Sequence, residues 1–303
     1  MAGLNHVFTP EVSAQIRRIE LSTRGLVESL FSGEYQSVFK GRGLEFSDVR
    51  EYQPGDDVRA IDWNVTARRG RPFIKEFVEE RQLTALVMVD LSASKSFGTG
   101  EKSNALIASE IGAILALAAT SNNDRIGLLL VTDHVEHFVP PDTGRGHALR
   151  VVLELLAFEP HGRKTALSTG LRYADKVLRQ RTTVFLISDF LVDESADPNL
   201  GHAIRRLAWD HDLVPIRLTD PRTYELPDVG LLAMVDPENG LRRVVNTADA
   251  EVRRGYRVKA EEQRQAVDDT FRDLRLHAVD IDTTDEYLPP LIGFFRQRAR
   301  AAR

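Results

Sequence analysis

The central part of the chain alternates between short apolar runs and longer amphipathic segments. Each apolar run is a candidate buried strand, because a strand covered on both faces carries apolar side chains without alternation. Each longer segment repeats apolar positions at the spacing of one helix face. Candidate strands lie at residues 83–89, 125–132, 183–188 and 213–218, and candidate helices at 102–120, 146–158, 165–179 and 199–211. The alternation predicts an α/β fold, with a mainly parallel sheet and helices on both of its faces.

The flanking segments extend this pattern in both directions. Before the core, the spacing predicts a helix at 10–32 and strands at 44–52 and 72–78. Within and after it, we expect an edge strand at 135–139, a hairpin of 231–235 with 242–245, a long charged helix at 248–274, a strand at 276–281 and a last helix at 287–302. We therefore expect two regions. Residues 1–82 form a helix and a small β-containing segment packed on the main domain, and residues 83–303 form the main domain.

Composition limits the functions that the chain can have. Its 303 residues are 42% hydrophobic and 28% charged, as in an ordinary globular protein, and a net charge of −5 gives no reason to expect nucleic acid. The absence of cysteine excludes disulfides, zinc–thiolate sites and thiol nucleophiles, and it fits a reducing compartment. The N-terminus lacks a signal-peptide pattern, and the longest apolar stretch, 111–119, is about half of a membrane span. We expect a cytoplasmic protein without a membrane span.

Oxygen-bearing side chains gather at three places: after two of the predicted buried strands and in a loop before a predicted helix. Asp90, Ser92 and Ser94 follow the first buried strand, Thr165 lies in a loop just before a helix, and Asp189 directly follows a later buried strand. If the strands that carry them are neighbours, all five side chains meet at the carboxyl edge of the sheet, where open α/β sheets bind ligands. A ligand set made of oxygen alone suits a hard cation such as Mg²⁺.

Two sets of motifs resemble known families. The first set is Asp90-x-Ser92-x-Ser94, the Thr165 loop with Gly170-Leu171 beyond it, and Ile187-Ser188-Asp189. It resembles the metal-ion-dependent adhesion site of von Willebrand factor A domains, and this resemblance covers residues 83–218. Many of these domains have Met after the final Ser of the motif. Here Lys95 stands in that place; it supplies no ligand, although its positive charge can weaken metal binding.

The second set lies just before the first and is longer. It comprises Arg42-Gly43-Leu44-Glu45-Phe46, Arg50-Glu51-Tyr52, Pro54-Gly55-Asp56-Asp57, Ile61-Asp62-Trp63 and Ala67-Arg68. It resembles the bacterial domain-of-unknown-function 58 family, whose members place this signature directly before a von Willebrand A-like domain. Its Arg and Asp residues suggest ion pairs on a solvated face. We also expect Trp63 and Phe73 to be the apolar anchors of this region.

The resemblance implies a function. Ser92, Ser94 and Thr165 would supply hydroxyl ligands to Mg²⁺, or to Mn²⁺ or Ca²⁺, and Asp90 and Asp189 would supply carboxylates, at least one of them through a bound water. The cation would then accept an acidic side chain from a partner protein. Members of the family commonly lie beside MoxR-type AAA+ ATPases. This implies an adaptor that acts with such an ATPase when protein complexes are matured or remodelled.

Two other functions stay open on the residues alone. A metal-dependent phosphate-ester hydrolase would use Asp90 as its nucleophile, but the second carboxylate that such enzymes usually place two residues later is replaced by Ser92. Neither Ser92 nor Ser94 lies in the G-x-S-x-G turn of a serine hydrolase. A third possibility is a metal that only ties the loops together. We therefore assign no catalytic residue and expect a protein that is not an enzyme.

Overall fold

The computed structural model describes residues 45–78, 82–92, 103–162, 164–192, 195–235 and 241–301. The described residues fall into two compact units, a small one that ends at Leu83 and a large one that continues from Thr84. The helix predicted at 10–32 lies outside the described residues. That the N-terminal region packs on the main domain stays a prediction.

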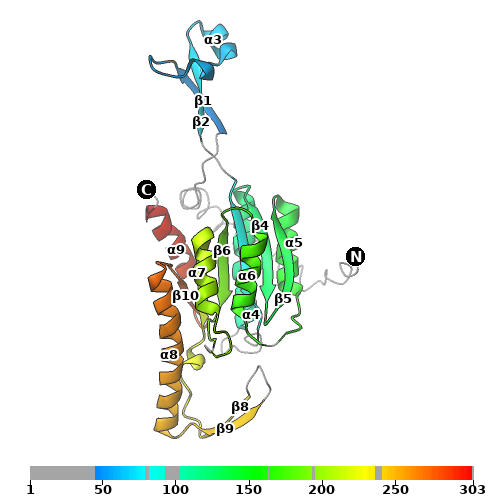
Figure 1. The fold of residues 1–303 in the computed structure, drawn as a ribbon, viewed down its shortest axis with the longest axis vertical. Helices are drawn as coiled ribbons and strands as arrows, with labels where there is room; N and C mark the ends of the chain where they lie inside the picture. The colour runs from blue at the N-terminus through cyan, green and yellow to red at the C-terminus, as the bar shows by residue number, and fades with distance from the viewer. Residues whose placement is uncertain are drawn as a thin grey trace. The chain divides into compact units, whose positions relative to one another are not determined.

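The large unit is built on a six-stranded sheet with the strand order β10-β7-β6-β3-β4-β5 (Figure 1). Neighbouring strands are parallel except for β5, which pairs antiparallel with β4 at one edge. The strands are β3 (Thr84–Asp90), β4 (Arg125–Val131), β5 (Val135–Asp142), β6 (Thr183–Ser188), β7 (Asp212–Thr219) and β10 (Val279–Asp282). This pairing confirms the mainly parallel sheet predicted from the apolar runs. Every residue of β3 and of β6 is buried, as expected for strands that are covered on both faces.

Helices cover both faces of this sheet, as predicted. One face carries α4 (Asn104–Ser121), α5 (Arg145–Ala157) and α9 (Leu288–Ala301), and the other carries α6 (Leu167–Val177), α7 (Leu200–Asp210) and α8 (Ala250–Asp273). Side chains of β3 alternate between the faces. Val87 lies toward α4, where it is close to Gly112, whereas Leu86 and Met88 point toward α6.

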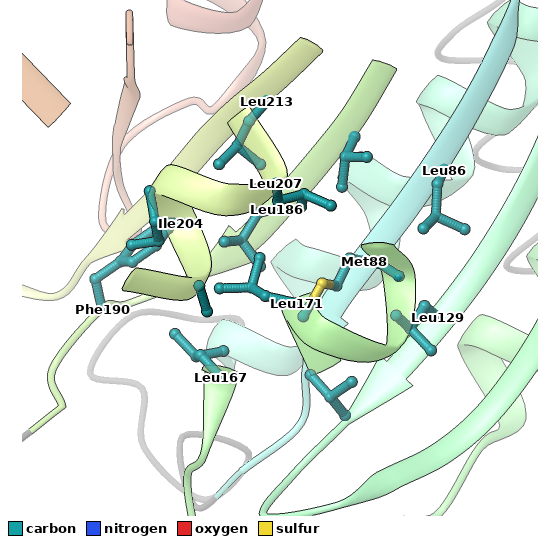
Figure 2. Close-up of a cluster of buried hydrophobic side chains, with 14 of the residues drawn as sticks. Leu86, Met88, Leu129, Leu167, Leu171, Leu186, Phe190, Ile204, Leu207 and Leu213 are labelled. Atoms are coloured by element: carbon teal, nitrogen blue, oxygen red, sulfur yellow. The ribbon is translucent and has the colours of Figure 1, made fainter. Parts of the chain in front are cut away.

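The core on the second face holds α6, α7 and α8 against the sheet. Figure 2 shows Leu171 of α6 and Leu207 of α7 among Met88 and Leu186 from the strands, and all four side chains are fully buried. Phe271 of α8 joins this cluster through an edge-to-face contact with the Phe190 ring, with 5.3 Å between ring centroids. Each such side chain contributes about 1.5–3 kcal/mol relative to an exposed position. This packing fixes the helices that flank the candidate site.

Helix α4 is a core helix of the large unit. By length and composition it could cross a membrane, and it is the helix in the described part of the chain that meets this test. However, 72% of the stretch is buried inside the fold, against β3, β4 and α5. Its apolar composition is therefore accounted for by packing within the domain.

The small unit is an antiparallel hairpin of β1 (Glu45–Glu51) and β2 (Phe73–Val78), with η2 (Val58–Ala60) and α3 (Trp63–Arg69) between them. Arg50 and Asp56 form a two-pronged ion pair, with two N–O distances of 2.8 Å, and this pair lowers the pKa of Asp56. The Asp56 carboxylate also accepts from the backbone N–H of Gln53, 2.8 Å away. The signature residues therefore close a turn around Gly55, whose φ of +111° favours glycine.

Helix α3 is absent from the sequence-based prediction. Asp57 caps the short helical turn η2, as its place before Val58 in the sequence predicts, by accepting the Arg59 N–H. Asp62 likewise accepts backbone N–H groups at the start of α3. Trp63 begins α3 with 67% of its surface exposed, so it does not anchor the core of the small unit. A helix of seven residues gives too short a pattern for its periodicity to stand out.

Two further elements connect β7 to α8. A short 3₁₀ turn, η4 (Pro221–Thr223), follows β7, and a separate antiparallel hairpin of β8 (Leu231–Val235) and β9 (Arg242–Asn246) follows η4. The hairpin is as predicted. The last strand begins later than expected, because the turn after α8 continues to Leu276, whose N–H donates to the Phe271 carbonyl at 2.8 Å.

Candidate metal centre

Asp90 links the ends of two neighbouring strands at the carboxyl edge of the sheet. It is the last residue of β3 and is 6% exposed. Its Oδ2 accepts a hydrogen bond from the Ser188 hydroxyl of β6 at 2.7 Å, and its Oδ1 accepts from the Ser92 backbone N–H at 2.9 Å. These bonds fix the carboxylate between β3 and β6, because a buried charge-assisted hydrogen bond is costly to break.

The other predicted ligands of this motif are Ser92 and Ser94, of which only Ser92 is among the described residues. Ser92 is 4% exposed and is held by its backbone N–H on Asp90. Ser94 and Lys95 lie outside the described residues. The structure therefore brings Asp90 and Ser92 together, and it leaves the role of Ser94 as predicted from the sequence.

Asp189 lies on the β6 side of Asp90. It directly follows β6, is half-buried, and its Oδ1 accepts the backbone N–H of Leu191 at 3.0 Å. The next residue, Phe190, has a φ of +56°, a left-handed conformation that is uncommon outside glycine. Its N–H donates to the Ser188 hydroxyl at 3.0 Å, and the same hydroxyl holds Asp90. Ser188 thus connects the Asp90 and Asp189 loops.

Thr165 lies on the opposite side, beside the end of β4. Helix α6 begins at Leu167, two residues later than Thr165, which is therefore in a turn rather than at the helix start. The next residue, Ala166, donates its N–H to the carbonyl of Thr132 at 3.2 Å. Thr132 directly follows Val131, the β4 partner of Asp90 in the sheet register. The loops of Thr165 and Asp189 therefore lie at the strands on either side of Asp90.

Close packing of α6 fixes where the Thr165 loop can lie. A Cβ on Gly170 would be 2.5 Å from Met88 Cε and 2.6 Å from Val131 Cγ1, so only glycine lets the helix approach β3 and β4 this closely. At the helix start, the buried carboxylate of Asp197 accepts the Ser168 N–H at 2.8 Å. That contact satisfies an N–H that the helix itself leaves unpaired.

Glu136 on β5 holds the segment before Thr165, and the sequence analysis missed it. Its carboxylate accepts the backbone N–H groups of His161 and Gly162, at 3.0 and 2.7 Å, and the Thr132 hydroxyl at 2.9 Å. A Cβ on Gly162 would lie 2.3 Å from Thr132 Oγ1, so glycine is required there by the close approach of the two loops. Glu136 therefore ties the β4–β5 turn to the Thr165 loop.

Hydrogen bonding keeps Glu136 ionised. Burial alone raises its pKa, but the donors of Gly162, Thr132 and His161 outweigh burial and lower the pKa to about 2. The side chain is 2% exposed, and His134 stands 3.4 Å from it on the solvent side. The hydrogen bond that His134 donates to the Asp133 carboxylate, followed by the opposing effect of burial and then by the charge of Glu136, leaves the pKa of His134 raised.

The donors at this edge fit a hard cation. Asp90, Ser92, Thr165 and Asp189 offer carboxylate and hydroxyl oxygens, and two carboxylates balance the charge of one divalent ion. Asp90 already accepts two protein hydrogen bonds, so its remaining lone pairs suit contact through a bound water. Within the described ranges, no group of three or more His, Asp or Glu residues could hold a metal. A cation at this edge would therefore depend on the hydroxyls.

Asn104 adds a further oxygen near this edge. It is the first residue of α4, the helix that comes after β3 in the chain, and it is 4% exposed. Its Oδ1 is buried and has no hydrogen-bond partner among the described residues. A bound water or ion would satisfy such an atom.

Comparison with known families identifies the chain's relatives. A family model described as "Protein of unknown function DUF58" matches residues 48–266, which is more than half of the chain. The chain is a member of the DUF58 family. A relative of this DUF58 chain, an uncharacterized protein of Mycobacterium bovis, is 30% identical over 298 residues, covering 97% of this chain and 92% of the relative. The family resemblance predicted from the signature before residue 70 is confirmed.

Solved structures similar to this DUF58 chain are more distant. BatB, a conserved hypothetical protein from Bacteroides thetaiotaomicron, is 14% identical with a TM-score of 0.48, covering 72% of this chain and 99% of BatB. A von Willebrand factor type A structure from Catenulispora acidiphila is 10% identical with a TM-score of 0.41, covering 74% and 43%. Scores this low add no argument about the site, so the fold rests on the sheet order and helices of the chain itself.

Proposed function

We propose that this DUF58 chain is a protein-interaction module that binds a divalent cation at the carboxyl edge of its sheet. Through the cation it would bind an acidic side chain of a partner protein. The observation that carries this proposal is the buried Asp90 carboxylate, bonded to Ser188 and Ser92 and flanked by the loops of Thr165 and Asp189. An arrangement this rigid costs little to reorganise when a ligand binds.

Each residue has a defined part in the proposed site. Ser92, Ser94 and Thr165 would offer hydroxyl oxygens, and Asp189 would offer a carboxylate from a half-buried position. Asp90 would act through a bound water, because both of its oxygens already accept protein hydrogen bonds. Mg²⁺, Mn²⁺ or Ca²⁺ would supply an electrophilic centre that accepts one more anionic oxygen.

Cation binding is tested first, on the full chain by titration calorimetry with MgCl₂, MnCl₂ and CaCl₂. We expect one site for at least one cation, and we expect Asp90→Asn and Thr165→Val each to weaken it at least tenfold. Thr165→Val keeps the shape of the side chain and leaves the Asp90 bonds intact, so it separates ligation from folding. The matched control is Asp273→Asn, an exposed carboxylate at the end of α8. If no cation binds, or if Thr165→Val binds as the native chain does, the site is wrong.

The partner follows from the family resemblance. We propose that the chain acts in the cytoplasm as an adaptor for a MoxR-type AAA+ ATPase during the maturation or remodelling of protein complexes. Purified chain and ATPase are mixed with Mg²⁺ or EDTA and separated by size-exclusion chromatography. A complex that EDTA and Asp90→Asn both abolish supports the proposal, whereas a complex that neither affects overturns the metal-mediated contact.

Thermal melting and a phosphate-ester assay separate the proposal from its alternatives. A purely structural metal predicts that EDTA lowers the melting temperature while no association depends on the cation. A hydrolase predicts turnover of generic phosphate esters that Asp90→Asn abolishes. The Ser92 N–H donates to Asp90, and Ser92 stands where such hydrolases usually place a second carboxylate, so the local geometry gives the hydrolase no additional support.

A further inference from the structure

Asn104 has a buried side-chain oxygen that the described part of the fold does not use. It is the first residue of α4 and is 4% exposed, and its Oδ1 has no hydrogen-bond partner among the described residues. An asparagine at a helix start commonly caps the helix, but here Ser103 does so by accepting the Leu106 N–H at 3.3 Å. The Asn104 oxygen is therefore left over, and a buried acceptor of this kind needs a bound water or ion.

The sheet topology places Asn104 at the edge that carries the candidate metal centre. Because β3 and β4 are parallel neighbours, the helix that joins them begins at the carboxyl edge and runs back to the start of β4. Gly112 of α4 lies beside Val87, since a Cβ added there would be 3.2 Å from Val87 Cγ1. Asn104 is about 12 Å before Gly112 along the helix. Asp90 is about 10 Å beyond Val87 along β3. Asn104 and Asp90 therefore lie at similar heights, at the same edge.

The side chain of Asn104 belongs to the face of α4 that packs on the sheet. Ala108, Ile111 and Leu115 follow it at helical spacing and are at most 3% exposed. They form part of the apolar stripe through which α4 contacts β3 and β4. Asn104 is a polar residue at the start of this stripe, where the stripe reaches the ends of the strands. Its position explains both its burial and its closeness to the carboxyl edge.

Asn104 approaches this edge from a different side than the predicted ligands. Thr165 comes just before α6 and Asp189 just after β6, whereas α4 covers the opposite face of the sheet from α6 (Figure 1). The first turn of a helix carries partial positive charge, which by itself disfavours a cation. The carbonyl dipole of Asn104 counters this effect, because it offers a neutral acceptor on the α4 side. A hydrated cation at the edge would thus find an acceptor there for one of its waters.

We propose that Asn104 is a positioning residue of the candidate metal centre, whose Oδ1 accepts a hydrogen bond from a water bound to the cation. The inference rests on the proposed function, because it assigns a further residue to the same cation. Mg²⁺ usually keeps several of its waters in proteins, and each buried water needs an acceptor. An amide oxygen orients such a water without adding negative charge, so the cation can still accept the partner's carboxylate.

Replacing Asn104 by leucine tests the proposal, because leucine has a similar shape and no oxygen. On the full chain, we expect Asn104→Leu to weaken the binding of MgCl₂ or MnCl₂ at least fivefold in titration calorimetry. In EDTA its melting temperature should equal or exceed that of the native chain, since the lost oxygen was unsatisfied. Asn104→Asp keeps an oxygen in place and should bind the cation at least as tightly as the native chain.

The matched control is Asn122→Leu at the other end of α4. Asn122 is half-buried and donates to the Ala118 carbonyl at 3.1 Å, so this variant should leave the cation affinity unchanged. If Asn104→Leu binds the cation as the native chain does and melts at a lower temperature in EDTA, its oxygen holds only a structural water. The proposal would then be wrong.

A paramagnetic cation tests the placement of Asn104 independently of affinity. Its side-chain amide signal is assigned in proton–nitrogen spectra by its absence from the spectrum of Asn104→Leu. Substoichiometric MnCl₂ should broaden this signal more than that of Asn122, and Thr165→Val should reduce the broadening. Equal broadening of the two asparagine signals would place the cation elsewhere and overturn the inference.

The inference and the proposed function can fail separately. If Thr165→Val weakens cation binding and Asn104→Leu does not, the proposed function stands and this inference is wrong. If Asn104→Leu weakens binding and Thr165→Val does not, Asn104 stands as a residue of the site and the proposed ligand set is wrong. If the native chain binds no cation, both are wrong.

Discussion

The central strand β3 and the hairpin strand β8 are built from similar side chains and end in opposite environments. Every residue of β3 is buried, from Thr84 to Asp90, whereas exposed and half-buried residues alternate along β8. The charged group at the end of β3 is a carboxylate held inside the protein, and the charged groups of β9 are arginines in solvent. Leucine and valine content therefore does not decide which strand belongs to the core.

The two regions differ in how their polar and apolar groups are held. At the sheet edge, burial requires each polar group to have a fixed partner, so Asp90 and Glu136 are held in one geometry. At the hairpin, the strands pair only with each other among the described strands, and Leu231, Val235 and Val244 are exposed. The first is suited to precise ligation, and the second to contact area.

Truncating one leucine in each region is the strongest test of this difference. Leu186 is fully buried in β6, so Leu186→Ala should lower the free energy of unfolding by about 2–5 kcal/mol. Leu231 is 75% exposed, so Leu231→Ala should change it by less than about 0.5 kcal/mol. Urea unfolding followed by circular dichroism measures both. Similar losses would show that Leu231 is packed in the free protein and that β8 does not differ from the core strands in burial.

The sequence predicted those elements whose pattern is continuous. The strands β3, β4, β6 and β7 are mainly apolar runs, α4 is long and apolar, and α6 has a periodic apolar face, so their existence followed from the residues alone. Asp90 and Asp189 were recognised because a carboxylate at the end of an apolar strand breaks the pattern. The pairing of strands placed their loops beside one another, and the order β6-β3-β4 is the neighbour relation that the prediction required.

Other parts of the site could not be predicted because their partners are backbone groups far along the chain. Glu136 accepts N–H groups 25 and 26 residues away, and no side-chain pattern records such a contact. The sequence held one indication of this contact, Gly162, because a glycine in a loop before a helix often allows two backbone segments to approach closely. The N-cap role of Asp62 was not predicted, because an N-cap aspartate and a surface aspartate look alike in sequence.

Replacing Glu136 by Gln tests whether the sheet edge is as rigid as the hydrogen bonds indicate. The pKa of Glu136 falls from 4.5 to about 2 on folding, which corresponds to about 3 kcal/mol. Since the pKa is lowered, this stabilisation is complete above about pH 4.5 and is lost as the pH falls toward 2. Glu136→Gln should therefore cost about 1–3 kcal/mol at pH 7 and progressively less below pH 4.5, measured by urea unfolding.

The control for this variant is Glu159→Gln, an exposed carboxylate in the turn after α5. It should unfold as the native chain does at every pH. A Glu136→Gln protein that loses the same stability at pH 3 as at pH 7 would show that the loss comes from shape and not from charge.

Replacing a glycine by alanine should change stability in opposite directions in two of the helices. Gly170→Ala places a Cβ 2.6 Å from Val131 Cγ1, so α6 must shift, at a cost of about 1–3 kcal/mol. Gly255 lies within α8, and a Cβ added there would meet no atom within 4 Å, so Gly255→Ala should raise stability by up to about 1 kcal/mol. Thermal melts of the two variants should move in opposite directions. If Gly255→Ala lowered the melting temperature, the surface of α8 around Gly255 would have to be in contact with another part of the protein.

The smallest expected effect is the titration of His134, which lies at the solvent side of the Glu136 network and is half exposed. Its pKa should lie above 6.5, because Asp133 accepts its Nδ1 hydrogen bond at 2.9 Å and Glu136 adds negative charge. A raised pKa means that this contact stabilises the fold below pH 6.5 and is lost as the pH rises through the folded value. Proton–nitrogen correlation spectra across pH 5–9 would measure it. Asp133→Asn should lower the pKa most and Glu136→Gln less, since the hydrogen bond with Asp133 is the larger cause. If Glu136→Gln lowered the pKa of His134 more than Asp133→Asn did, the buried Glu136 carboxylate would be the larger cause. His134 would then belong to the hydrogen-bonded network around Glu136.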